Sequence, residues 1–84
     1  MKPIRLSAHA RGYFQRRGFT AEEVEDTIRS SPREDAELGR LQCTKDFFFG
    51  REWNGRVFGT KRVRPVFVED EDEIVVVTVY TYYF

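Results

Sequence analysis

The sequence has few cysteines and no long apolar run, so it has little that could form disulfides or hold the protein in a membrane. It has 84 residues and one cysteine, so no internal disulfide can form and a secreted disulfide scaffold is not indicated. Residues 1–5 lack the apolar run of a signal peptide. The longest apolar run, near the C-terminus, is too short to cross a bilayer. These absences predict one cytoplasmic domain over residues 1–84 with no membrane partner.

The sequence also has little that points to a cofactor or a metal. No glycine-rich phosphate loop and no pair of catalytic carboxylates is visible. Cys43 lacks a second cysteine or a nearby histidine, so it supports neither a metal site nor a thiol nucleophile. The acidic run 69–73 lacks the alternating ligands of a calcium loop. We therefore expect no cofactor and no bound metal.

The chain has no net charge, but its charges come in blocks. Fourteen lysines and arginines balance fourteen aspartates and glutamates, which argues against a strongly basic nucleic-acid-binding protein. Residues 1–17 and 40–64 are basic, whereas residues 22–37 and 69–73 are acidic. A fold that separates these blocks could present one basic face, although solvated surfaces of mixed sign are the commoner result.

Two N-terminal helices are predicted from their capping signals. Ser7 is a good N-cap for a first helix that runs to about Arg17. Thr20 and Glu23 form the capping box of a second helix, which ends at residues 30–32, Ser-Ser-Pro. Residues 33–40 are polar and are expected to form a loop.

The rest of the sequence has the alternating pattern of strands. Four strands are predicted at residues 43–49, 56–60, 65–68 and 74–82, with Asn54-Gly55 as a two-residue hairpin turn. Residues 4–6 also alternate and could form a further short strand. Short connections favour an antiparallel meander. The predicted fold is α+β, with two N-terminal helices packed on one face of a twisted, mainly antiparallel four-stranded sheet. The thirteen aromatic residues are expected to build most of its core.

The last predicted strand has two different faces. Val75, Val77 and Val79 alternate on one face, which is expected to meet the helices. Thr78 and Tyr80 lie on the other, which is then the candidate working surface.

Several of these segments together resemble the uncharacterised DUF4258 family. They are Ile4-x-Leu6-Ser7-x-His9-Ala10, Arg16 to Val24, the basic segment Asn54-Gly55-Arg56, and the ending Ile74 to Tyr80. The resemblance implies a RelE-like domain, similar to the RelE/ParE and BrnT-type toxins. Many of those are free or ribosome-dependent endoribonucleases that an antitoxin protein neutralises. It implies RNA or the ribosome and an antitoxin as candidate partners; a second copy of the chain is a further candidate, as a partner in dimerisation. The zero net charge departs from typical toxins of this group.

By position, the residues that the family marks fall on His9, Arg16 or Arg17, Arg56, Thr78 and Tyr80. We add Arg64, because strand arginines can hold a scissile phosphate. The leading hypothesis is a toxin-type, metal-independent endoribonuclease whose catalytic set is His9, Arg16, Arg56, Arg64, Thr78 and Tyr80.

Within that set, His9 is the only histidine of the chain and the candidate acid or base. The arginines would hold phosphate, and Thr78 and Tyr80 would support the scissile site. Neighbouring bases such as Lys61 and Arg62, and aromatics such as Phe48, could bind and stack nucleotides.

Structural explanations stay open for each of these residues. His9 could simply cap a helix or fasten it to the sheet, and the strand bases could protect a sheet edge. The rival function is a non-catalytic protein-binding module of the same fold, which would dock a partner along an exposed strand or on the aromatic C-terminal tail.

Overall fold

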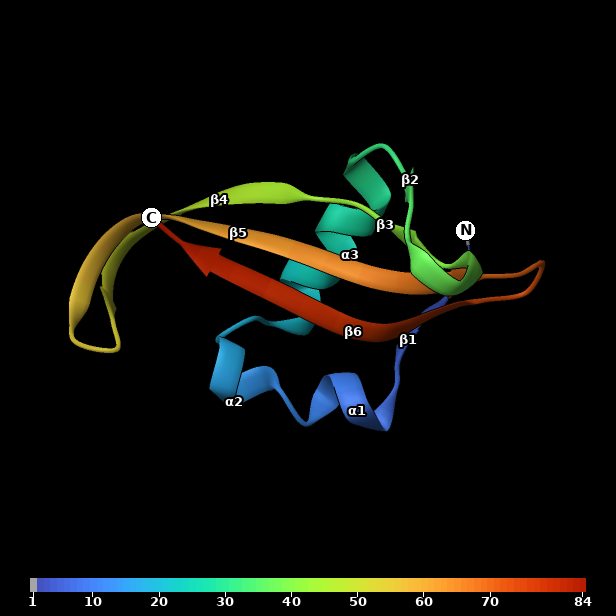
Figure 1. The fold of residues 1–84 in the computed structure, drawn as a ribbon, viewed down its shortest axis with the longest axis horizontal. Helices are drawn as coiled ribbons and strands as arrows, with labels where there is room; N and C mark the ends of the chain where they lie inside the picture. Colours follow the sequence, from blue (N-terminus) through green and yellow to red (C-terminus); the bar gives the residue numbers. More distant parts are fainter. Residues whose placement is uncertain (1) are drawn as a thin grey trace.

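The computed structural model describes residues 2–84 and contains three short α-helices and a six-stranded sheet (Figure 1). The helices are α1 (Ala8–Arg11), α2 (Phe14–Arg17) and α3 (Ala21–Ser30), and a 3-10 turn, η1, spans Glu37–Gly39. The strands are β1 (Ile4–Leu6), β2 (Glu34–Asp35), β3 (Leu41–Gln42), β4 (Lys45–Trp53), β5 (Arg56–Glu69) and β6 (Ile74–Tyr83).

The sheet is mixed, so the prediction of four mainly antiparallel strands is wrong. Its order is β1-β6-β5-β3-β2, and β4 also pairs with β5. Strand β1 runs parallel to β6, with Ile4 opposite Ile74. Strands β3 and β4 lie end to end along β5, because Leu41 pairs with Phe67 and Lys45 pairs with Val63. Two further strands lie outside the predicted ranges: β2 falls in residues 33–40, which were expected to form a loop, and β3 directly precedes the strand predicted at 43–49.

The first predicted helix is in fact two helices. Ser7 caps α1 by accepting from the backbone N–H of Ala10 at 3.1 Å, as its position predicts. The helix ends at Gly12, whose N–H bonds to the Ala8 carbonyl, and Tyr13 leaves the helical region at φ −104° and ψ 4°. Glycine is a poor helix former, so the chain turns here at little cost.

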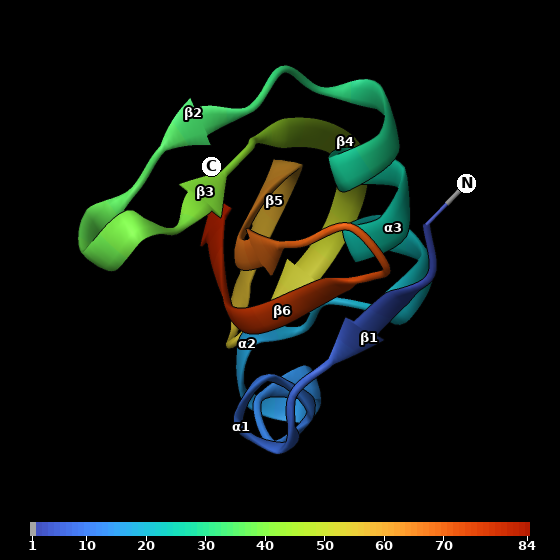
Figure 2. The same ribbon diagram turned by 90° about the vertical axis from the view of Figure 1, so that its right-hand side faces the viewer.

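The second helix is the element that local signals predicted best. In α3, Thr20 and Glu23 form the expected capping box, with bonds of 2.9 and 3.1 Å. Helix α3 packs on β5, whereas α1 packs against β1 and β6. The helices therefore do not share one packed layer in the way that was predicted, and in Figure 2 α3 and α1 lie on different sides of β6.

Strands β4 and β5 form one long hairpin that projects from the body of the molecule (Figure 1). The turn is at Asn54 and Gly55, both with positive φ (53° and 84°), as the sequence predicted. Strand β5 continues without a break through Pro65, so the two strands predicted at 56–60 and 65–68 are one. A bulge in β4 shifts the register between Phe48 and Arg51.

The buried core is mainly aliphatic rather than aromatic. It is formed by Ala10, Phe19, Val24, Ile28, Cys43, Val63, Phe67, Ile74, Val76 and Val79. Only two of these residues are aromatic. Several other rings gather instead around Tyr83, where Trp53 stacks at 4.8 Å and Phe49 meets the ring edge-on at 5.1 Å. The expectation that aromatics fill the core is therefore wrong, and most rings are left partly accessible.

Candidate functional site

Two adjoining pockets form one groove on the face of the sheet opposite α3. One pocket lies under the arm, by which we mean β2, η1 and β3 (residues 34–42), and the other lies beside α1. The arm compartment has a volume of about 550 Å³ and the helix compartment about 560 Å³. They share Arg40, Thr78 and Tyr80, so these three residues join the compartments into one continuous surface.

A bulge in β6 decides which side chains form the floor of this groove. Val66 pairs with Thr78, but Phe67 pairs with Val76, so Val77 is an extra residue in β6. The bulge exchanges the two faces of the strand at this point. Before it, Ile74 and Val76 enter the core, and after it Val79 does. The predicted all-valine face is therefore wrong, although Thr78 and Tyr80 do lie on the groove side.

The helix wall of the groove carries His9, Tyr13 and Arg17. The His9 and Tyr13 rings lie 4.9 Å apart, and the Arg17 guanidinium carbon lies 4.0 Å from the Tyr13 ring centre. The break between α1 and α2 sets this spacing. In one continuous helix, Arg16 would instead share the face of His9, because it lies seven residues further on.

Arg17 fastens the helix wall to the floor. Its Nη1 donates to the Val79 carbonyl at 2.7 Å and to Thr78 Oγ1 at 3.3 Å. Its guanidinium carbon also lies 5.2 Å from the centre of the Tyr80 ring. Arg17 is thus held in place from two sides, by the Tyr13 ring and by β6.

Arg64 repeats this arrangement on the other side of Tyr80. Its guanidinium carbon lies 5.2 Å from the Tyr80 ring and 5.3 Å from the Tyr82 ring, and Nη2 donates to the Tyr82 hydroxyl at 2.7 Å. Its Nε atom is buried without a hydrogen-bond partner among the described residues. His9, Tyr13, Arg17, Tyr80, Arg64 and Tyr82 therefore form a continuous series of stacked rings and guanidinium groups, which we call the ladder.

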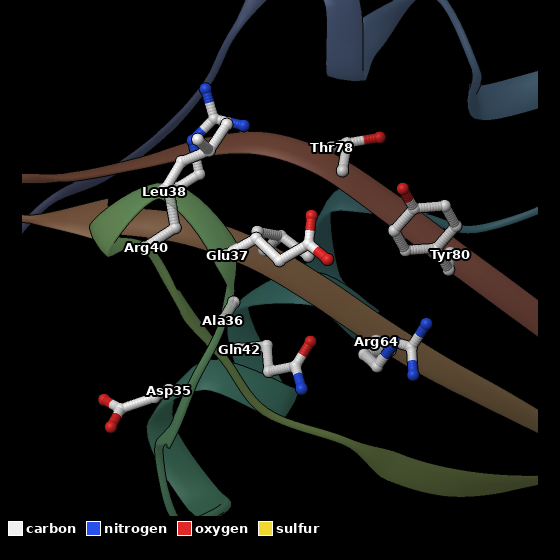
Figure 3. A pocket seen from close by; sticks show the side chains of 10 residues that line it. Asp35, Ala36, Glu37, Leu38, Arg40, Gln42, Arg64, Thr78 and Tyr80 are labelled. Atoms are coloured by element: carbon white, nitrogen blue, oxygen red, sulfur yellow. The ribbon is translucent and has the colours of Figure 1, made fainter.

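The arm provides the opposite wall and adds acidic groups to it. In Figure 3 the Glu37 carboxylate points toward the side of the pocket on which Arg64 and Tyr80 lie, whereas the Asp35 carboxylate points away from it. Glu37, Gln42 and Arg64 all line the arm compartment. Leu38, at the tip of the arm, has φ 60° and is 84% exposed. A leucine in this backbone region is uncommon, and here it holds an apolar side chain at the rim of the groove.

The groove arginines differ from most other cations of the protein in having no acidic partner. Seven ion pairs occur among residues 2–84, and none includes Arg17, Arg40 or Arg64. A guanidinium group without a carboxylate keeps its donors free for an anionic ligand. The groove is therefore suited to bind a phosphate.

The structure brings together four of the six predicted site residues. His9 lines the helix compartment, Arg64 lines the arm compartment, and Thr78 and Tyr80 line both. Arg16 and Arg56 lie outside the groove: Arg16 covers the Tyr13 ring at 5.3 Å, and Arg56 flanks the turn of the long hairpin, 5.5 Å from the Phe58 ring.

Sequence reasoning missed Arg40 and chose Arg16 for the catalytic set, whereas the groove contains its neighbour Arg17. The family resemblance allowed either of the two arginines, but only Arg17 lies in the groove. Arg40 sits in a segment predicted to be a featureless loop, and no local signal marks it. It reaches the groove because β2 and β3 pair antiparallel and carry the arm back over the sheet.

Other basic side chains that were considered for phosphate binding are occupied elsewhere. Lys61 is 2% exposed and binds Glu23 at 2.7 Å and the Gly18 carbonyl at 2.9 Å. Arg62 makes a two-bond pair with Asp46, at 2.7 and 3.0 Å. These cations stabilise the fold and do not face the groove.

The remaining reactive groups give no second site. Burial raises the pKa of the Cys43 thiol to about 11, and its Sγ contacts the Thr27 carbonyl at 3.5 Å. Within the described part of the chain, no three His, Cys, Asp or Glu side chains gather as metal ligands would. No helix within residues 2–84 is both long and apolar enough to span a membrane.

Comparison with known proteins identifies the chain only at the level of a family. Residues 6–81 match the model of a family described as a domain of unknown function, DUF4258. No curated protein and no solved structure matches.

Proposed function

The chain belongs to the DUF4258 family, and from that premise we propose that its groove binds single-stranded RNA and that His9 helps to cleave the bound strand. The observation that carries the proposal is the ladder, in which cations and rings alternate across the groove. A toxin-type role, like that of the RelE/ParE and BrnT-type proteins, is part of the same proposal.

Charge supports an anionic ligand. Arg17, Arg40 and Arg64 have no carboxylate partner, and the helix compartment that Arg17 and Arg40 line contains no acidic side chain. Its polar groups are instead donors or neutral hydroxyls. Phosphate oxygens are acceptors only, so this compartment suits the backbone of a nucleic acid.

The rings support a single strand rather than a duplex. Tyr80 is 40% exposed and Tyr82 is 41% exposed, so each presents ring surface to the solvent. Unpaired bases stack on such rings, with about 1–3 kcal/mol gained per base, whereas paired bases hide their faces in the duplex. The alternating guanidinium groups would then meet the phosphates between stacked bases.

The chemistry that fits His9 is attack by the ribose 2′-hydroxyl on the adjacent phosphorus. The imidazole would accept the 2′-hydroxyl proton as the new O–P bond forms and the bond to the 5′-oxygen breaks. The leaving 5′-oxygen would take a proton from water, which leaves a 2′,3′-cyclic phosphate and a 5′-hydroxyl. Arg17 would stabilise the negative charge that develops on the phosphorane oxygens.

A cleavage assay with end-labelled RNA, with and without ribosomes, tests this proposal. We expect His9→Ala to lower the cleavage rate by about 100-fold or more while RNA binding is retained. Arg16→Ala is the control, because Arg16 belongs to the same predicted catalytic set but lies on the next helix, α2, outside the groove. It should cleave at the wild-type rate.

Two results would count against the proposal in different ways. Undiminished cleavage by His9→Ala would remove the imidazole from the mechanism and leave the groove as a binding site only. If the wild-type protein neither binds nor cleaves RNA, the nucleic-acid proposal is wrong and the non-catalytic protein-binding function is favoured.

A further inference from the structure

The two compartments of the groove differ in charge, and we infer that the arm compartment holds one guanine base of the bound strand. This inference rests on the proposed RNA binding. The juxtaposition that carries it is an acidic acceptor, Glu37, and a cationic donor, Arg64, which share the space of the arm compartment beside the Tyr80 ring (Figure 3).

An acidic side chain is out of place in a site built only for phosphate. Glu37 would repel a phosphate that lay in the arm compartment, whereas the helix compartment has no such group. The backbone phosphate therefore belongs beside Arg17. The arm compartment is left for a neutral part of the nucleotide that offers hydrogen-bond donors, which is the base.

The Glu37 carboxylate distinguishes between the bases because an ionised carboxylate only accepts hydrogen bonds. Guanine presents two adjacent donors, N1–H and the N2 amino group, which match the two carboxylate oxygens. Adenine and cytosine place an acceptor nitrogen beside their amino group, and uracil flanks its single N–H with two carbonyl oxygens. Each of the three would set an acceptor against the carboxylate.

Arg64 complements the other edge of the same base. Guanine carries the acceptors O6 and N7 there, which arginine recognises with two parallel hydrogen bonds. The Arg64 side chain is pre-positioned, since Nη2 is held by the Tyr82 hydroxyl at 2.7 Å and the guanidinium lies beside two rings. Nη1 and the second hydrogen of Nη2 take no part in that bond and remain available for the two hydrogen bonds to the base.

Tyr80 and Leu38 would cover the two faces of the base. Tyr80 lines both compartments, so a base that stacks on its ring is next to the phosphate site. Leu38 lines the arm compartment from the tip of the arm and is otherwise exposed to solvent. A bound base would remove that apolar side chain from water.

Affinity measurements with short 2′-O-methyl oligonucleotides test the inference, because such strands lack the attacking hydroxyl and stay intact. The probes are pentanucleotides of uracil with guanine, inosine, adenine, cytosine or uracil at the central position. We expect the guanine strand to bind about tenfold tighter than the adenine, cytosine and uracil strands. Inosine, which lacks only the N2 amino group, should fall in between.

The matched pair of variants is Glu37→Gln and Asp35→Asn. Both remove one negative charge from the arm, but only the Glu37 carboxylate points toward the side of the pocket on which Arg64 and Tyr80 lie (Figure 3). Glu37→Gln should abolish the preference for guanine, and Asp35→Asn should retain it.

The possible failures are distinguishable. Tight but equal binding of all five strands, or an unchanged preference in Glu37→Gln, would overturn the guanine inference and leave the proposed RNA binding intact. If none of the strands binds, the proposed function is overturned, and the guanine inference with it.

Discussion

The α3 face and the groove face of the sheet differ in how their charged side chains are partnered. Around α3, cations and carboxylates are paired: Lys61 binds Glu23, Lys45 binds Asp26 and Arg29 lies near Glu25. Across the sheet, Arg17 and Arg64 stack on tyrosine rings, and no carboxylate among residues 2–84 pairs with them or with Arg40. The net charge of zero conceals this division.

The contrast separates stability from ligand binding. A paired charge contributes to the fold but has little left to offer a ligand, whereas an arginine beside a ring keeps most of its donors. Substitutions on the α3 face should therefore change the free energy of unfolding. Substitution of Arg64 should change affinity for RNA and leave stability nearly unchanged, whereas substitution of Arg17, which also fastens α2 to β6, should change both.

The largest expected effect is on stability and comes from substitution of Lys61, on the α3 face. Its ammonium group is buried with Glu23 and the Gly18 carbonyl, so Lys61→Ala leaves a largely buried carboxylate without its cationic partner and with only the Thr20 N–H as a donor. We expect a loss of about 3–5 kcal/mol in the free energy of unfolding, measured by urea denaturation. The exposed pair of Lys45 and Asp26 is the control, and Lys45→Ala should cost at most about 1 kcal/mol. Equal losses in both variants would contradict the distinction between buried and exposed pairs.

The next largest effect should be on the groove side, at Arg64. Arg64→Ala removes a charged donor from the arm compartment, so RNA affinity should fall about 10- to 100-fold. The slope of log affinity against log salt should also become shallower. Arg62→Ala is the control on the same strand, because Arg62 is paired with Asp46 and exposed. If Arg62→Ala weakens binding as much as Arg64→Ala, the groove is not the RNA site.

Local features of the fold were predictable, and the pairing of distant segments was not. The predicted features all join residues that are at most four positions apart, so the sequence shows them directly. They are the Ser7 cap, the Thr20–Glu23 capping box and the Asn54-Gly55 turn. The parallel pairing of Ile4 with Ile74 joins residues 70 positions apart. No local pattern shows such a pairing, and it is the feature that makes the sheet mixed.

The candidate site was predicted in part for the same reason. Thr78 and Tyr80 share a strand face by simple alternation, and both line the groove. The faces of the other β6 residues were predicted wrongly because Val77 forms a bulge, which interrupts the alternation. A bulge depends on how two strands pair, so the sequence of one strand does not reveal it. Arg40 reaches the site only through the folding of the arm.

The two adjacent arginines of α2 offer a smaller, sharper test of the contrast. Arg17 lines the helix compartment and holds Thr78 and Val79, whereas Arg16 is exposed. Arg17→Lys keeps the charge but loses the flat guanidinium that stacks on Tyr13, so RNA affinity should fall about tenfold. Arg16→Lys should bind like the wild-type protein in the same titration. A loss of equal size in both would show that the charge of α2 matters and the stacking does not.

The smallest effect should appear on acidification, and only in stability. Hydrogen bonds from Arg33 and Lys2 lower the pKa of Glu69 below its ordinary 4.5, and one from Lys45 lowers the pKa of Asp26 below its ordinary 3.8. A carboxyl group whose pKa is lower in the folded state stabilises the fold above its unfolded pKa, and that contribution is lost as the pH falls through the folded pKa.

The free energy of unfolding should therefore decline as the pH drops below about 4.5, in a series of urea titrations. Glu69→Gln removes part of this dependence, because the variant has no carboxylate to protonate, and it should lower stability at neutral pH by at most about 1 kcal/mol. Arg64→Ala is the control from the groove. Arg64 is not a partner of Glu69 or Asp26, so the free energy of unfolding of this variant should depend on pH as that of the wild-type protein does. Suppose that the free energy of unfolding does not change with pH in Glu69→Gln and changes less in Arg64→Ala than in the wild-type protein. The charges of the groove and of the α3 face would then be coupled to each other.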